Sequence, residues 1–197
     1  MLLEPGQEKR FMAYLFDLAR EGHENRGALA ELRSGLGKKP GDMMRVHRHV
    51  VPFLPEKYGW QDRRYYLIAT LFGFYPVHQD PTIHRSGDRE WLEYMSVGES
   101  FGSVWREREH AESIEARFIA LLNADADDLD DHLRHVISLL KTHEKPLDWR
   151  RLFSDILRWD YQERIVQKSW ARDFYKHSPS SGATVENHVK EEENQEV

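Results

Sequence analysis

The stretch from 147 to 176 places large apolar residues at the three- and four-residue spacing of α-helices, in two halves that meet at Trp159 and Asp160. Half of the six tryptophans in the chain fall within it. Because each tryptophan buries a large apolar area, we expect two amphipathic helices that close the core over the upstream chain. Asp160, with Glu163 three residues later, predicts a capping box at the corner between them.

The same periodicity recurs upstream, and no stretch alternates apolar and polar residues between turn signals as a strand would. Further helices are predicted over 7–21, 25–36, 42–51, 61–75, 91–105, 114–122 and 129–140. In the helix 61–75, the side chains of Tyr65, Ile68, Phe72 and Tyr75 should point inward. The sequence therefore predicts an all-α fold of eight or nine helices, in one or two small bundles.

A polar segment and an acidic end suggest how the chain is divided. We expect a helical bundle over 1–76, a loop or linker over 77–90, a second bundle over 91–176 and a disordered tail over 177–197. The tail holds five Glu and one Lys among its 21 residues.

Five aspartates lie between 125 and 131, at the start of the predicted helix 129–140, and Lys141 follows the end of that helix. Acidic residues at the start of a helix and a basic residue at its end suit the helix dipole, so we expect the aspartates to have a capping role.

The chain contains no cysteine, which excludes disulfides, thiolate chemistry and cysteine-based zinc sites. Histidine and carboxylate ligands occur only in incomplete sets. His132 and His135 lie three apart, and Glu107 with His110 forms one Glu-x-x-His motif where a di-iron bundle needs two. We expect neither a metal nor a cofactor.

No apolar run is long enough to span a bilayer and no signal sequence opens the chain, which predicts a soluble cytoplasmic protein without a membrane partner.

The sequence also lacks complete catalytic motifs. Ser100 lacks the GxSxG frame of a nucleophile elbow, and the glycine-rich segment 35–41 carries two lysines without the GxxxxGK[ST] spacing of a phosphate-binding loop. No carboxylate is expected to stand inside an apolar run, where burial would raise its pKa. The sequence therefore predicts that the protein is not an enzyme.

Charge is distributed unevenly along the chain. The net charge is -6, but the acidic tail carries most of it, and the segment 26–49 has six basic residues against two acidic ones. Arginines also sit on the helical faces of several predicted helices. Each of them is as compatible with a solvated or ion-paired surface position as with binding to a polyanion.

Several segments occur in an ordered arrangement with characteristic spacing: RGALAELR at 26–33, SIEARFIALLNAD at 113–125, Leu129 with Leu133 and Arg134, LDW at 147–149, and WARDFY at 170–175. Together they resemble the CasB family, the small subunits of the type I-E CRISPR surveillance complex called Cascade. The resemblance runs from about 28 to 175, and the loop 78–88 and the acidic tail after His177 match no feature of the family.

This resemblance implies an all-α, non-catalytic subunit that sits as a head-to-tail pair in the complex, against the subunits that hold the guide RNA. It also implies a basic surface that helps to hold the DNA strands of the R-loop, particularly the displaced strand. The expected partners are the other Cascade subunits, the guide RNA, the target DNA strands and a second copy of the chain. No sequence-reading motif is needed for contacts to phosphates.

Basic residues at matching positions are the candidates for these phosphate contacts. We place Arg33, Arg117 and Arg134 first, followed by Arg26, Lys38, Lys39, Lys141 and Arg158. The main alternative is a helical scaffold that bridges proteins without nucleic-acid contacts, which the negative net charge favours. An enzyme with a metal site at His132 and His135 is a third hypothesis. Binding is favoured over scaffolding if Arg33, Arg117 and Arg134 share one face, and scaffolding if they scatter or pair with carboxylates.

Overall fold

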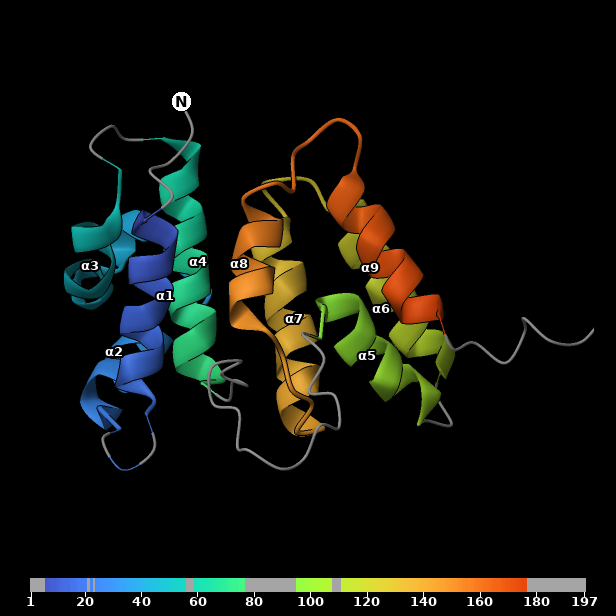
Figure 1. The fold of residues 1–197 in the computed structure, drawn as a ribbon, viewed down its shortest axis with the longest axis horizontal. Coiled ribbons are helices and arrows are strands. Elements are labelled where there is room, and N and C mark those ends of the chain that lie inside the picture. Colours follow the sequence, from blue (N-terminus) through green and yellow to red (C-terminus); the bar gives the residue numbers. More distant parts are fainter. Residues whose placement is uncertain are drawn as a thin grey trace, which may run out of the picture.

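A computed structural model describes residues 6–20, 22, 24–55, 59–76, 95–107 and 111–176 (Figure 1). Within these ranges the chain forms nine α-helices, two short 3-10 helices and no strand. The α-helices are α1 (Gln7–Leu18), α2 (Arg26–Ser34), α3 (Met44–Val50), α4 (Trp60–Phe74), α5 (Val97–Arg106), α6 (Ala111–Asn123), α7 (Leu129–Thr142), α8 (Trp149–Ile156) and α9 (Ile165–Tyr175), and the 3-10 helices are Pro40–Asp42 and Val51–Phe53. The all-α fold with eight or nine helices is therefore confirmed.

Helix α4 is the central element of the N-terminal half. It is buried along most of its length, including the four side chains predicted to point inward, Tyr65, Ile68, Phe72 and Tyr75. Helices α2 and α3 pack directly on α4, and α1 contributes Phe11, whose ring centroid lies 5.0 Å from that of Tyr65. Figure 1 shows these four helices side by side as one group.

Helices α5 to α9 form a second group, in which α5 packs against α9 and α6 against α7. Phe118 of α6 stacks on Phe174 of α9 with ring centroids 4.1 Å apart. The two groups meet where α4 contacts α7 and α8. There Phe153 of α8 packs against both Phe11 and Tyr65, so both groups share one hydrophobic core. The predicted linker 77–90 and the predicted tail 177–197 lie outside the described residues and stay predictions.

The three tryptophans of the stretch 147–176 are buried as predicted. Trp149 packs edge-on against Phe72 of α4, and Trp159 lies 5.1 Å from Trp170 between ring centroids. The predicted corner between these helices is wrong in detail, however. Residues 157–164 are not α-helical, and α9 begins after Arg164, which adopts a left-handed conformation with φ of 49°.

Asp160 does not cap α9, and the predicted capping box with Glu163 does not form. The carboxylate of Asp160 instead accepts a hydrogen bond of 3.2 Å from the guanidinium of Arg64, which is only 2% exposed. A buried guanidinium requires a counter-charge, and this requirement determines the direction of the Asp160 side chain. Tyr161 and Ile165, which belong to the apolar pattern of the stretch 147–176, are 47% and 57% exposed.

The aspartates before α7 also act differently from the capping role predicted for them. The side chain of Asp128 at the N-cap makes no capping hydrogen bond, whereas Asp125 accepts from the backbone N–H groups of Asp127 and Asp128. Asp127 and Asp130 bind Arg63 of α4 at 3.0 and 2.8 Å. The acidic run therefore serves mainly to tie α7 to α4.

Two further expectations are corrected by the structure. Asp155 stands inside the apolar face of α8 and is buried, and burial raises its pKa although it accepts hydrogen bonds from Trp170 and Arg158. A carboxylate does therefore occur in an apolar run. Of the helix predicted over 91–105, residues 91–94 lie outside the described residues, and α5 begins at Val97, where the hydroxyl of Ser96 accepts from the backbone N–H of Glu99 as an N-cap.

Candidate nucleic-acid interface

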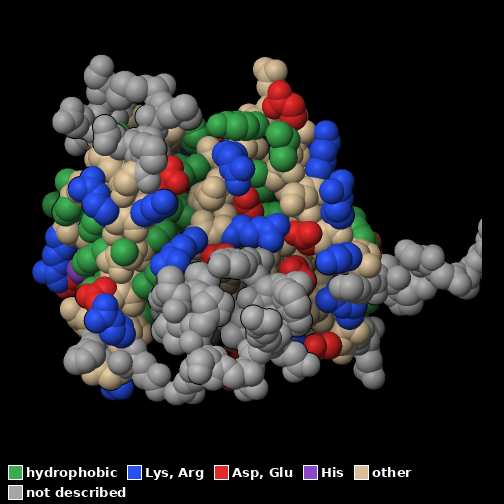
Figure 2. All heavy atoms as spheres, in the orientation of Figure 1, with side chains coloured by type: hydrophobic (Ala, Val, Ile, Leu, Met, Phe, Trp, Pro, Cys, Tyr) green, Lys and Arg blue, Asp and Glu red, His purple; other side chains and the backbone are tan. Residues whose placement is uncertain are grey.

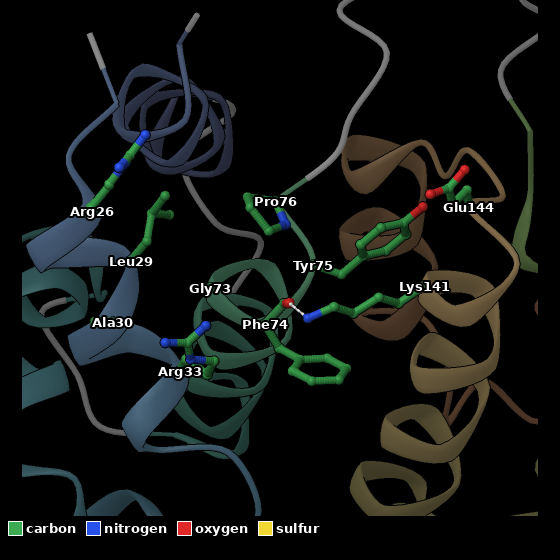
Figure 3. A pocket seen from close by; sticks show the side chains of 10 residues that line it. All are labelled: Arg26, Leu29, Ala30, Arg33, Gly73, Phe74, Tyr75, Pro76, Lys141 and Glu144. Carbon is green, nitrogen blue, oxygen red and sulfur yellow. Dashed lines mark hydrogen bonds between the residues drawn. The ribbon is translucent and has the colours of Figure 1, made fainter.

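A cleft of about 690 Å³ opens between α2 and α7 at the C-terminal end of α4 (Figure 3). We call it the α2–α7 cleft. Cationic and apolar side chains from three helices line it: Arg26, Leu29, Ala30 and Arg33 from α2, Gly73 and Phe74 from α4, Tyr75 and Pro76 after it, and Lys141 with Glu144 from the end of α7. Arg26, Arg33 and Lys141, all candidates from the sequence, therefore share one cleft.

Gly73 brings α2 into direct contact with α4. A Cβ atom added at Gly73 would lie 2.5 Å from Cβ of Leu32 and 2.8 Å from the backbone nitrogen of Arg33. Atoms at these distances overlap, so only glycine permits the crossing of the two helices. The close approach places the exposed side chain of Arg33 directly beside the end of α4.

Helical spacing brings Arg26 to the same wall as Arg33. The two residues are seven apart, which is two turns of helix, and both are exposed. Asn25 begins α2 by accepting a 3.0 Å hydrogen bond from the backbone N–H of Ala28. The pairing of Arg26 and Arg33 follows from the sequence, because it depends only on helix geometry.

Lys141 reaches the cleft from the opposite side. Its ammonium group donates a 2.8 Å hydrogen bond to the carbonyl oxygen of Phe74 and lies 4.1 Å from the centroid of the Phe74 ring (Figure 3). The carbonyl is one of the last of α4, so the positive charge also complements the negative end of that helix. An ammonium group has three donors, and this bond uses one of them.

The loop after α2 extends the line of cations toward the middle of α7. Gly37 adopts a positive φ of 77°, and a Cβ there would meet the guanidinium of Arg134 at 2.5 Å. Arg134 thus lies against the loop whose exposed lysines are Lys38 and Lys39. We use the name basic track for six residues: Arg26, Arg33, Lys38, Lys39, Arg134 and Lys141.

Ion pairing leaves most of the basic track available. Arg26 lies 3.6 Å from Glu24 and Arg134 lies 3.1 Å from Asp131, in both cases between exposed partners. Exposed pairs of this kind contribute little free energy, so an anion can replace the carboxylate. Arg33, Lys38 and Lys39 form no ion pair within the part of the chain that the structure describes.

Two predicted contact residues lie away from the track. Arg117 is exposed on α6, which packs against α5 and α7, and it does not line the cleft. Arg158 follows α8 and is held by its own neighbours, donating to the carbonyl of Ser154 and to Asp155, both at 3.0 Å. The three first-ranked arginines therefore do not share one unpaired face, because Arg117 lies apart and Arg134 pairs with Asp131. By the criterion set from the sequence this favours a scaffold, and the case for binding rests on the other members of the basic track.

Sequence reasoning placed Tyr75 in the core but did not identify Tyr75 or Glu144 as residues that shape the cleft between the cations. Tyr75 donates a 3.0 Å hydrogen bond to the carbonyl of Lys145, and its pKa is raised by burial and, to a smaller extent, by the charge of Glu144. Glu144 has a φ of 51° at a helix end where glycine is usual. The absence of a glycine between the end of the predicted helix at Leu140 and Pro146 was the available signal.

Charge by itself does not single out a binding surface on this protein. Figure 2 shows Lys and Arg side chains over much of the face that it presents, with acidic side chains between them. The arrangement of each cation relative to carboxylates is therefore the more informative property. Among the described residues, no three histidine or acidic side chains gather closely enough to hold a metal ion, and no helix there is long and apolar enough to cross a membrane.

The fold and the site define a small all-α protein with a cation-rich cleft between two helix groups. A family model described as CRISPR-associated protein Cse2 matches residues 28–175. The chain belongs to this family, for which CasB is another name, so the resemblance found in the sequence is confirmed.

Relatives cover most of this chain. The CRISPR-associated protein Cse2 of Thermus thermophilus is 34% identical over 169 residues, which are 84% of this chain and 86% of that protein. A crystal structure of CasB from Thermus thermophilus matches with a TM-score of 0.67 and 30% identity, covering 88% of this chain and 99% of that one. CasB from M. ruber matches with a TM-score of 0.65 and 28% identity, covering 88% and 94%.

A chain from a CRISPR RNA-guided surveillance complex shares the fold, with a TM-score of 0.66 and 23% identity, covering 87% of this chain and 92% of that one.

Proposed function

We propose that this chain is a non-catalytic small subunit of a CRISPR RNA-guided surveillance complex that holds nucleic-acid backbones on its basic track and stabilises the R-loop. Its partners would be the other subunits of that complex, the guide RNA, the target DNA strands and a second copy of itself. Membership of the Cse2 family supports the assignment to such a complex. The displaced non-target strand is the expected ligand of the track.

The observation that carries the proposal is the gathering of six candidate cations along α2, its following loop and α7. They come from two segments that are distant in the sequence, 26–39 and 134–141, and two separate contacts position these segments: Gly73 of α4 against α2, and Arg134 against Gly37. All of these cations are exposed except Arg134, which is partly buried. Such a line suits a phosphate backbone, which carries one negative charge for each nucleotide and needs no base-reading group.

Modest contacts of this kind are sufficient for the proposed role. R-loop formation exchanges one duplex for another of similar stability, so protein contacts to strand backbones can shift the balance. Such contacts act on every sequence alike, and they weaken steeply as the salt concentration rises. The track therefore supplies affinity, while base pairing with the guide supplies sequence specificity.

The test is a charge reversal on the track, measured in the assembled complex. Arg33→Glu combined with Arg134→Glu should weaken binding to target DNA, and should reduce the slope of log K against log salt by about 0.7 to 0.9 for each phosphate that the variant no longer binds. The matched control is Lys168→Glu with Arg172→Glu, which makes the same charge change on exposed positions of α9. Circular dichroism and subunit incorporation establish that each variant folds and assembles.

Arg117→Glu, tested separately, asks whether the cation outside the track contributes. An unchanged DNA affinity of the incorporated track variant at two salt concentrations would refute the proposal. Equal reductions of affinity in the track variant and in the α9 control would refute it as well, because the effect would then follow net charge rather than position.

A protein-bridging scaffold is the second candidate function, and exposed apolar side chains favour it. Ile119 of α6 is 45% exposed, and Tyr161 and Ile165 near the start of α9 are 47% and 57% exposed. Apolar side chains at the surface suit a protein partner better than a phosphate backbone. Under this function the track variant would bind DNA as the wild type does, whereas Ile165→Asp would reduce incorporation into the complex.

A further inference from the structure

The end of α7 carries a glutamate at a position where glycine is the usual residue. The backbone N–H of Lys145 bonds to the carbonyl of Leu140 at 2.9 Å, and the N–H of Glu144 bonds to that of Lys141 at 3.2 Å. This pair of bonds is the Schellman motif, which requires a left-handed residue after the helix. Glu144 is that residue, with φ of 51°, and any side chain with a Cβ is strained there.

The side chain of Glu144 faces the α2–α7 cleft. Figure 3 shows it on the α7 wall, across the cleft from Arg26 and Arg33, with Tyr75 directly beside it and Pro76 nearer the α2 wall. Glu144 is exposed and forms no ion pair within the described ranges, and the neighbouring Lys145 is bound to Glu107 at 2.7 Å instead. One wall of the cleft is therefore cationic and the other presents a free carboxylate.

A carboxylate opposes phosphate binding, so a site for phosphate alone would gain from its removal. The arrangement instead suits a ligand with an anionic end and a hydrogen-bond-donating end, joined by a flat apolar body. The apolar lining of Leu29, Ala30, Phe74 and Pro76 would contact that body. The cleft volume of about 690 Å³ lies in the range of small-molecule sites and accommodates one nucleotide.

Among the nucleobases, guanine matches a carboxylate best. Its pairing edge presents two neighbouring donors, N1–H and the N2 amino group, and these can bond to both oxygens of one carboxylate. Thymine and uracil present a single N–H between two carbonyl oxygens, and those oxygens would face the carboxylate unfavourably. A carboxylate can accept from the amino groups of cytosine and adenine, but through one bond only.

We propose that the α2–α7 cleft holds one guanosine nucleotide of single-stranded nucleic acid, with its phosphate on Arg33 and Lys141 and its base edge on Glu144. This inference rests on the proposed function, since it gives the same basic track a base preference at one position. Binding of the guanine would fix the position of the strand along the basic track, which otherwise binds every sequence alike.

The experiment measures binding of the full chain to short oligothymidines that carry dG, dC, dA or dT at one central position, by fluorescence anisotropy at low salt. The dG oligonucleotide should bind more tightly than the dT one by at least about fivefold, as expected for a bidentate contact to a base edge. Glu144→Gly should abolish this preference and strengthen binding to the dT oligonucleotide by removing the opposing charge. The same variant should have a higher Tm, because glycine adopts the left-handed conformation without strain.

Two controls separate the base preference from the phosphate contacts. Glu163→Gly makes the same charge change in the segment between α8 and α9 and should keep the preference for dG. Arg33→Ala should weaken binding to all four oligonucleotides by the same factor. Equal affinity for dG and dT in the wild type overturns the inference and leaves the proposed function intact. If neither the full chain nor the assembled complex binds any of the oligonucleotides at low salt, the proposed function fails and the inference falls with it.

Discussion

At the N-terminal end of the parallel pair α4 and α7, Arg63 and Arg64 are enclosed by the carboxylates of Asp127, Asp130 and Asp160. At the C-terminal end of the same pair, Arg33 and Lys141 face an open cleft. Desolvation alone would lower the pKa of Arg63, but its hydrogen bonds to the two aspartates outweigh this effect and raise it. We call these regions the paired end and the cleft end.

The comparison teaches that the number of arginines on a helix says little about their role. Both ends have neighbouring cations, but at the paired end carboxylates from distant segments neutralise them, and at the cleft end they do not. A guanidinium that is buried among carboxylates stabilises the fold and is not available to a ligand, because separating it from its counter-charge costs free energy. Cations without such partners are the ones that can bind phosphate.

The largest expected effect comes from removing the buried arginine of the paired end. Arg64→Ala should lower the free energy of unfolding by about 3 kcal/mol, the lower end of the range for breaking a buried ion pair, because Asp160 is partly exposed and retains some solvation. Arg33→Ala at the cleft end should change it by less than about 0.5 kcal/mol. Urea unfolding of both variants provides the measurement. If the two variants are equally stable, the distinction between the two ends is wrong.

The second prediction concerns the glycine that positions the cleft end. Gly73→Ala should cost about 2 kcal/mol, because the added methyl group meets backbone atoms of α2 that cannot move aside cheaply. It should also weaken nucleic-acid binding by displacing Arg33 from Lys141. Thermal unfolding and oligonucleotide binding test the two parts together.

Gly27→Ala is the matched control for this change. A Cβ there meets only the side-chain oxygen of Asn25, at an ordinary contact distance of 3.7 Å. Alanine at this helical position should be neutral or stabilise the protein by up to about 1 kcal/mol. A Gly73→Ala variant that is as stable as Gly27→Ala would show that α2 does not depend on the close approach.

The smallest effect is expected at Lys141, which belongs to both structure and site. Lys141→Met keeps the aliphatic stem over the Phe74 ring but removes the charge and the bond to the Phe74 carbonyl, and should cost about 1 kcal/mol. Lys141→Arg retains a cation on the ring and should restore most of this stability. Thermal unfolding of the two variants provides the comparison. A Lys141→Met variant that is as stable as the wild type would show that Lys141 does not contribute to the stability of the fold.

Local patterns in the sequence predicted the helices and the burial of Trp149, Trp159 and Trp170, and helix spacing likewise accounts for the shared wall of Arg26 and Arg33. All of these follow from the period of the α-helix and from the apolar area of the side chains, which neighbouring residues specify. The corner at Asp160 and the role of the aspartates before α7 were not predictable in this way. Their side chains are directed by Arg63 and Arg64, which lie more than 60 residues away in the sequence.

The sequence alone therefore determined most of the helices, the burial of the three C-terminal tryptophans and which cations exist. Tertiary structure decided which cations are neutralised and which remain available, because a guanidinium and a carboxylate meet only where two helices cross. It also decided that Arg33, Arg134 and Lys141 lie along one track while Arg117 does not, since the crossing at Gly73 and the contact at Gly37 depend on packing between distant segments.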